Sequence, residues 1–156
     1  MPEAQQDRDA RWMREALAAA VEAGERDEVP VGACIVTNDD RLLAVAGNRT
    51  RTDCDPTAHA EIVALREAAR ELGNYRLTDA IVYSTIEPCA MCAGALVQAR
   101  VRRLVYGARD ERFGAVETHF RICDSSSLNH RMEITSGVLE TECRSIMQEF
   151  FRKRRQ

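Results

Sequence analysis

Apolar residues along the chain recur at helical spacing in some segments and form short, dense runs in others. The helical spacing predicts helices over residues 11–23, 55–73, 88–101 and 138–154. The dense runs, rich in β-branched side chains, predict strands over residues 29–36, 42–46, 80–86, 103–108 and 132–135. This alternation predicts an α/β fold with helices on both faces of one sheet, while the polar residues 1–10 are expected to be flexible.

Local signals mark two helix starts and one turn. Asp55 followed by Pro56 predicts a helix N-cap and first turn. Pro88 predicts the start of a second helix further along the chain. Asn38-Asp39-Asp40 joins the first two predicted strands, which indicates a hairpin.

Length and composition limit the class of protein. The 156 residues have room for one domain, 1–156. The composition, with 45% hydrophobic and 30% charged residues, excludes collagen-like and disordered chains. The net charge of −3 does not favour binding to nucleic acid. A polyanionic partner would have to bind at a local basic patch. No apolar run approaches the roughly 20 residues of a membrane span, which predicts a soluble protein with no membrane partner.

Six cysteines raise the question of disulfides. The chain starts without an apolar signal segment, so we expect a reducing, cytoplasmic location, where thiols are more often ligands, catalysts or apolar fillers. Cys34 lies in a predicted buried strand and Cys143 on an apolar helix stripe, which predicts fillers, whereas Cys54 and Cys123 stay unassigned.

His59, Cys89 and Cys92 are the residues that indicate chemistry. Imidazole nitrogen and thiolate sulfur are preferred zinc ligands, and three of them leave a fourth tetrahedral position for water. The two-residue gap between the cysteines lets both sulfurs reach one ion from a first helical turn, so two helix N-termini are expected to converge on the metal. Glu61 fits a proton carrier beside a zinc-activated water, which predicts hydrolysis.

The same residues allow a structural interpretation. A Cys-x-x-Cys pair can be a redox pair or half of a structural zinc site, with Cys54, Cys123 or His130 as a fourth ligand. The acidic residue at position 61 and the proline before Cys89 favour the catalytic interpretation.

His-Ala-Glu followed by Pro-Cys-x-x-Cys is the signature of the cytidine deaminase superfamily. The chain resembles, within it, the bacterial tRNA-specific adenosine deaminases from residue 12 onward, in the segments VPVGA at 29–33, DPTAHAEI at 55–62, NYRL at 74–77, EPCAMCAGA at 87–95, YGARD at 106–110, NHR at 129–131 and EFFRKRR at 149–155. The resemblance implies a three-layer α/β/α fold with a mixed five-stranded sheet, a homodimer, and one Zn²⁺ per subunit held by His59, Cys89 and Cys92. It also implies deamination of the wobble adenosine of a tRNA anticodon to inosine, in a tRNA for arginine, with Glu61 as the proton shuttle.

Substrate-binding residues follow from the same resemblance. Asn48 matches a substrate-contacting Asn, although the Trp that precedes it in many relatives is Gly47 here. The backbone N–H of Ala60 is expected near the purine edge, and Asp110 near the RNA backbone and sugar, unless Asp110 only caps its loop. Residues 111–120 depart from the small, glycine- and alanine-rich run of relatives, so the resemblance does not define the loop after Asp110.

The basic, aromatic segment 150–155 suits an anticodon stem-loop, because aromatic rings stack on bases while Arg and Lys neutralise phosphates. Phe150 falls on the apolar stripe and is predicted in the core, which leaves Phe151 and cations such as Arg152 for RNA. The alternative is one buried Phe and a solvated basic tail.

Two rival functions stay open at this point. The motif defines the chemistry but not the base, so a guanine or cytidine-type small-molecule deaminase is one alternative. A non-catalytic RNA-binding module with structural zinc is the other, and Glu61 argues against it, since such a module has no chemical need for that carboxylate.

Overall fold

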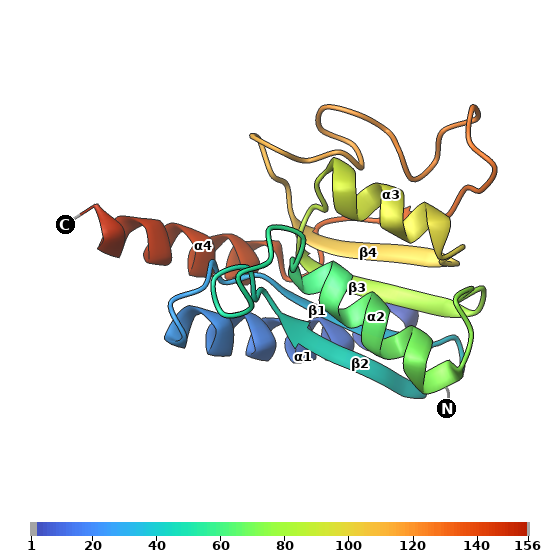
Figure 1. Ribbon diagram of the computed structural model, residues 1–156, viewed down its shortest axis with the longest axis horizontal. Helices are drawn as coiled ribbons and strands as arrows, with labels where there is room; N and C mark the ends of the chain where they lie inside the picture. The colour runs from blue at the N-terminus through green and yellow to red at the C-terminus, as the bar shows by residue number, and fades with distance from the viewer. Residues whose placement is uncertain (1–2, 156) are drawn as a thin grey trace.

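The computed structural model describes residues 3–155 of the chain. Its helices and strands follow the predicted alternation (Figure 1), in the order α1 (Gln5–Glu25), β1 (Gly32–Thr37), β2 (Leu42–Gly47), α2 (Ala60–Leu72), β3 (Ala80–Ile86), α3 (Ala90–Gln98), β4 (Arg103–Ala108), β5 (Glu133–Thr135) and α4 (Glu140–Arg154). The predicted bounds of β3 and β4 coincide with those observed.

The five strands form one mixed sheet in the order β2-β1-β3-β4-β5. β1 runs antiparallel to both β2 and β3, and β3, β4 and β5 are mutually parallel neighbours. The antiparallel hairpin needs only a short turn, whereas the parallel pair β3–β4 is joined through α3, as crossover geometry requires. The predicted mixed five-stranded sheet is confirmed.

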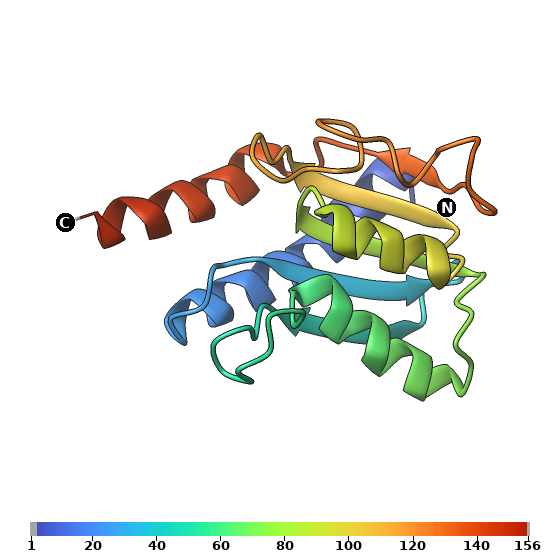
Figure 2. The same ribbon diagram turned by 45° about the horizontal axis from the view of Figure 1, so that its top comes forward.

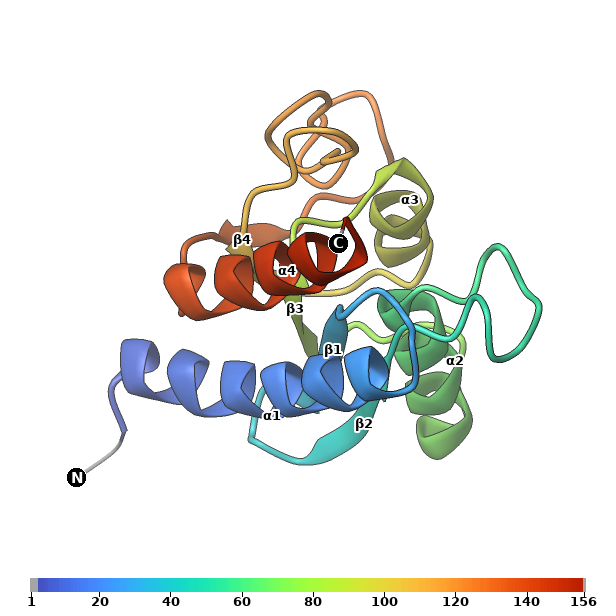
Figure 3. The same ribbon diagram turned by 90° about the vertical axis from the view of Figure 1, so that its left-hand side faces the viewer.

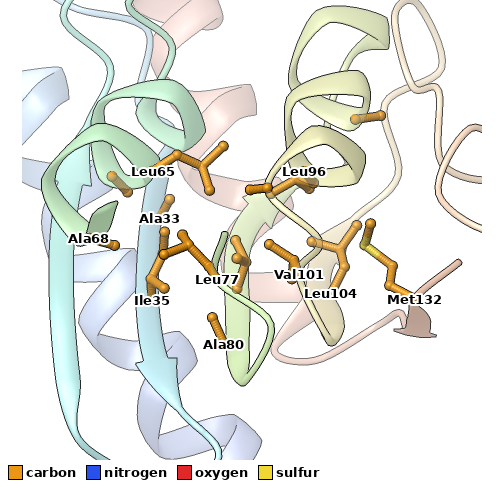
Figure 4. Packing of buried hydrophobic residues seen from close by; sticks show 14 of the residues in the cluster. Ala33, Ile35, Leu65, Ala68, Leu77, Ala80, Leu96, Val101, Leu104 and Met132 are labelled. Carbon is orange, nitrogen blue, oxygen red and sulfur yellow. The ribbon is translucent and has the colours of Figure 1, made fainter. Parts of the chain in front are cut away.

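Helices cover both faces of the sheet, so its strands bury both sets of side chains. Ala33 and Ile35 of β1 pack into the cluster under α2 and α3, of which Figure 4 shows a part. Cys34 and Val36, which alternate with them, pack into a second cluster beneath α1 and α4. Figure 3 shows α1 and α4 to one side of the sheet and α2 and α3 to the other. The three-layer α/β/α architecture is therefore confirmed.

Helix α1 packs so closely on the hairpin that its backbone touches the strand. A Cβ atom at Gly32 would lie 1.9 Å from the carbonyl oxygen of Ala16, a distance that no side chain can adopt. Glycine at position 32 thus sets the spacing between α1 and the sheet.

The start of α1 corrects the predicted flexible segment 1–10, of which residues 1 and 2 lie outside the described residues. The helix begins at Gln5, not near residue 11. The reason is a buried ion pair: Asp9 is 2% exposed, and its carboxylate accepts hydrogen bonds from Arg103 at 2.9 and 2.5 Å and from the Tyr83 hydroxyl at 2.8 Å. Tertiary contacts to β3 and β4 thus stabilise a polar helical turn that the local sequence pattern does not predict.

Helix α4 extends beyond the sheet with its C-terminal part (Figure 2). Phe150 is consequently half-buried, and the prediction that it belongs to the core is wrong. Its ring packs edge-on against Phe151, with centroids 5.4 Å apart, and lies under the guanidinium of Arg154. Within residues 3–155, no helix is long and apolar enough to cross a membrane.

Candidate active site

Two helix starts meet at one end of the sheet. His59 is the N-cap residue of α2, and Cys89 is the N-cap residue of α3. Figure 1 shows the first turns of both helices at the end of the sheet toward which α4 extends. The helix dipoles therefore direct their positive ends at the same point, which favours thiolate and other anionic groups there.

The start of α2 differs from the prediction, which placed its N-cap at Asp55. The Asp55 carboxylate instead accepts hydrogen bonds from the backbone N–H and the hydroxyl of Thr57, at 2.8 and 2.7 Å, and forms a turn before the helix. The helix begins at Ala60, so His59 and Glu61 occupy the cap and the first turn.

The three predicted ligands come together. His59 Nδ1 lies 3.6 Å from the Cys89 sulfur and 3.5 Å from the Cys92 sulfur. The ligand atoms of the three residues all lie within 4.8 Å of one another, and no other group of this kind was found among the described residues. This arrangement can hold a metal ion.

The residues considered as a fourth ligand lie outside that group. Cys54 is exposed, and its thiol points to the carbonyl of Arg51. Cys123 is buried beside the Ala93 carbonyl, and His130 lies 2.6 Å from the Val101 carbonyl. The three-residue group thus matches the ligand number of catalytic rather than structural zinc sites.

Glu61 lies buried next to this group, 4% exposed. Burial raises the pKa of its carboxyl to about 7. Within the described part of the chain, its Oε1 atom has no hydrogen-bond partner, and neither has Oδ1 of Asn48. Buried acceptors without partners are rare in folded proteins, so two of them in one pocket indicate a ligand that supplies donors.

The charge distribution around the three ligands favours a thiolate. The pKa of Cys89 is lowered to about 4, mainly by a hydrogen bond with Cys92 and to a smaller extent by one with His59. The hydrogen bond with Cys89 raises the pKa of His59 in turn. A thiolate at the start of α3 is the form in which cysteine binds a metal.

A pocket of about 880 Å³ opens above these residues. This volume suits a ligand the size of a nucleotide. Its walls include the predicted residues Asn48, Ala60, Asp110 and Phe151, but not Arg152, which pairs with Glu149 at 2.5 Å. Other parts of the wall are Thr50, Arg112, Phe113, Met147, Gln148, Arg154 and Arg155.

Two buried carboxylates that sequence reasoning missed support the loops around the pocket. Glu28 accepts hydrogen bonds from the backbone N–H groups of Arg51 and Thr52, at 3.2 and 2.7 Å, in the loop that follows Asn48. Burial alone would raise its pKa, but the hydrogen bonds from the loop outweigh burial and hold that pKa below its usual value.

Glu87 has the same role for the loop after β4, because its carboxylate accepts hydrogen bonds from residues 110–118. Hydrogen bonding again outweighs burial, and the pKa of Glu87 is lowered. The only local indication that Glu87 is buried is its position in the sequence, between an apolar strand and Pro88. Its partners are 23 to 31 residues away and leave no local signal.

Comparison with known proteins agrees with this site. The family model of the MafB19-like deaminases matches residues 7–155. The tRNA-specific adenosine deaminase of Haemophilus influenzae is 45% identical over 95% of this chain and 86% of its own length. That of Agrobacterium fabrum is 49% identical over 92% of this chain and 94% of its own.

A solved structure gives the same result. It comes from a study of A-to-I editing by deaminases acting at the wobble position of transfer RNA, and it superimposes with a TM-score of 0.84 at 48% identity, over 87% of this chain and 98% of its own. Nearly half of all residues are thus shared with such deaminases along almost the whole chain, and the chain belongs to the tRNA-specific adenosine deaminase family.

Proposed function

We propose that this protein converts the wobble adenosine of a tRNA anticodon to inosine by hydrolysis, with a zinc ion held by His59, Cys89 and Cys92. The observation that supports this most is the buried Glu61 carboxylate, which lies beside a three-residue metal-binding group and whose Oε1 atom has no hydrogen-bond partner among residues 3–155. A structural zinc site has no use for such a group.

The ligand geometry fits zinc. A tetrahedral zinc ion with Zn–S near 2.3 Å and Zn–N near 2.0 Å holds a nitrogen and a sulfur about 3.5 Å apart. The two nitrogen–sulfur distances here are 3.6 and 3.5 Å. Bound zinc lowers the pKa of water to about 7 and so supplies a hydroxide nucleophile at neutral pH.

Glu61 moves the protons of the reaction. Its carboxyl is buried beside the metal-binding group, where it can take up a proton and release it, as a general acid–base does. It accepts a proton from the attacking water, delivers it to N1 of the adenine, and then helps the C6 amino group leave as ammonia. Exclusion of solvent around Glu61 keeps these transfers between the carboxyl and the base.

Other residues of the pocket position the nucleotide. The Oδ1 atom of Asn48 accepts a hydrogen bond from the substrate, and the N–H of Ala60, in the first turn of α2, donates to the purine edge. Asp110 lies at the rim, in reach of the ribose and backbone. Phe151 and Arg152 meet the surrounding RNA from α4, Phe151 by stacking and Arg152 by its charge.

The partner is the anticodon stem-loop, and the tRNA for arginine is the substrate that follows from the resemblance. A tRNA substrate supports a cytoplasmic location, and the family resemblance supports a homodimer.

The test is an inosine assay. Purified, zinc-loaded protein is incubated with an arginine tRNA that carries adenosine at the wobble position, and with its anticodon stem-loop. We expect inosine from both RNAs, and none from the Glu61→Gln variant, which should still bind zinc. Turnover of free guanine or cytidine without inosine in the RNA would assign the site to a small-molecule deaminase and overturn the proposal.

A further inference from the structure

An aromatic side chain is exposed at the rim of the pocket, where nothing in the reaction described above uses it. Phe113, in the loop after β4, is 67% exposed and lines the pocket that contains Glu61. Tyr75 and Phe120 are exposed to a similar degree but are not part of that wall. A large apolar side chain left in solvent at a binding site indicates a contact with the ligand.

The loop that carries Phe113 is firmly held at its base. It passes beside the first turn of α3 (Figure 1), where the Ala115 N–H donates to the Pro88 carbonyl at 2.9 Å. The Glu87 carboxylate accepts hydrogen bonds from the N–H groups of Val116 and Glu117, at 3.1 and 2.8 Å. These bonds hold the C-terminal part of the loop against the start of α3.

The other side of the loop is closed by Asp110. Its Oδ1 atom accepts hydrogen bonds from the N–H groups of Arg112 and Phe113, at 3.0 and 3.2 Å, and its carbonyl accepts one from Gly114 at 3.0 Å. A Cβ atom at Gly114 would lie 2.3 Å from the Glu87 carboxylate, so only glycine lets the loop approach this closely. The backbone of Phe113 is therefore held while its ring is free to contact a ligand.

The chemistry around Phe113 is that of a single-stranded nucleic acid site. Arg112, Arg154 and Arg155 line the same pocket, and Phe151, 40% exposed, adds a second aromatic ring from α4. Cations that neutralise phosphates, combined with aromatic rings that stack on bases, are the usual composition of such sites.

We propose that Phe113 is a specificity-determining residue that stacks on a nucleobase next to the adenosine being deaminated. This inference rests on the proposed function. When one base turns into the pocket toward Glu61, its neighbours lose their stacking partner, and an aromatic ring at the rim replaces it. Phe113 is suited to this because its backbone is fixed in advance, so that little ordering is needed on binding.

The test combines protein variants with altered RNA. Phe113→Ala removes the ring, Phe113→Leu keeps apolar bulk without a π-face, and Phe113→Tyr keeps the face. The anticodon stem-loop is used unmodified and with an abasic residue on either side of the wobble position. The kcat/KM for inosine formation is measured for each combination, and thermal unfolding checks that each variant is folded.

With unmodified RNA, we expect Phe113→Ala and Phe113→Leu to lose about 5- to 100-fold in kcat/KM, mainly through KM, with Phe113→Tyr close to wild type. With the abasic residue at the stacked position, wild type and Phe113→Ala should react equally fast, because the partner of the ring is gone. The abasic residue on the other side should leave the difference between them intact.

The outcomes separate this inference from the proposed function. If the wild-type protein forms inosine and Phe113→Ala does so equally fast, or if its loss persists with both abasic RNAs, Phe113 does not stack on a neighbouring base. If the wild-type protein neither binds the stem-loop nor forms inosine, the proposed function fails, and this inference fails with it.

Discussion

Replacing Glu87 by Gln should destabilise the protein strongly although it changes a single oxygen. Oε1 of Glu87 accepts hydrogen bonds from the Asp110 N–H and the Thr118 hydroxyl, at 3.2 and 2.5 Å. Oε2 accepts from the N–H groups of Val116, Glu117 and Thr118, at 3.1, 2.8 and 2.9 Å. An amide must place its NH₂ group among these donors.

The least costly orientation puts the NH₂ group at the Oε1 position. The Thr118 hydroxyl can turn to accept from it, but the Asp110 N–H loses its acceptor, at about 1–3 kcal/mol. The three bonds to Oε2 also change from a charged to a neutral acceptor, which weakens each by about 1 kcal/mol. Because such losses are not fully additive, we expect the free energy of unfolding to fall by about 3–5 kcal/mol. That is a large part of the usual total of about 5–15 kcal/mol.

Urea unfolding followed by circular dichroism measures this change, and Glu111→Gln is the matched control, because Glu111 is an exposed carboxylate in the same loop. Amide hydrogen exchange should increase at residues 116–118 in Glu87→Gln alone. A loss below about 1 kcal/mol at an unchanged m-value, or one equal to that of Glu111→Gln, would refute the reasoning.

The pH dependence has a definite sign. The folded pKa of Glu87 lies below the value of about 4.3 for an unfolded chain. The stability that its carboxylate contributes is therefore fully present above that value and is lost as the pH falls through the folded pKa. The difference in unfolding free energy between wild type and Glu87→Gln should shrink below about pH 4.3.

Other variants test the rest of the site and the core. Glu61→Gln should keep its metal, measured by atomic absorption, and lose inosine formation by at least about 10²–10⁴-fold; an active variant would remove Glu61 from proton transfer. Cys89→Ser should lose both metal and activity, while Cys54→Ser, which changes an exposed thiol, should lose neither. Asn48→Ala should raise KM for the stem-loop more than it lowers kcat, and an unchanged KM would contradict its binding role. Asp9→Asn should lower the free energy of unfolding by about 3–5 kcal/mol, since it leaves a buried guanidinium unpaired; a change within 1 kcal/mol in urea unfolding would contradict this.

Local patterning predicts what depends on short-range regularity. The strands at 80–86 and 103–108 are dense apolar runs, and the structure has β3 and β4 at those residues. The ligand set could be proposed because zinc chemistry restricts residue types, and because a cysteine pair two residues apart fits the first turn of one helix.

The wrong predictions concern residues whose contacts in the folded chain differ from those that the local sequence pattern indicates. Helix α1 starts earlier than predicted because the buried Asp9 carboxylate pairs with Arg103, which is 94 residues further along the chain. Asp55 has the sequence of a helix cap, yet its side chain is occupied by Thr57, and the helix starts later. Phe150 has the spacing of a core residue, but α4 extends past the sheet that would cover it.

The placement of the ligands at two helix starts also has a mechanical consequence. His59 and Cys89 are 30 residues apart in sequence and belong to different helices of the same layer. An ion shared between them would act as a cross-link, and closing a loop of about 30 residues removes about 3–4 kcal/mol of chain entropy from the unfolded state. The bonds that make the site reactive would then also hold α2 to α3, and loss of the ion would remove this restraint between the two helices.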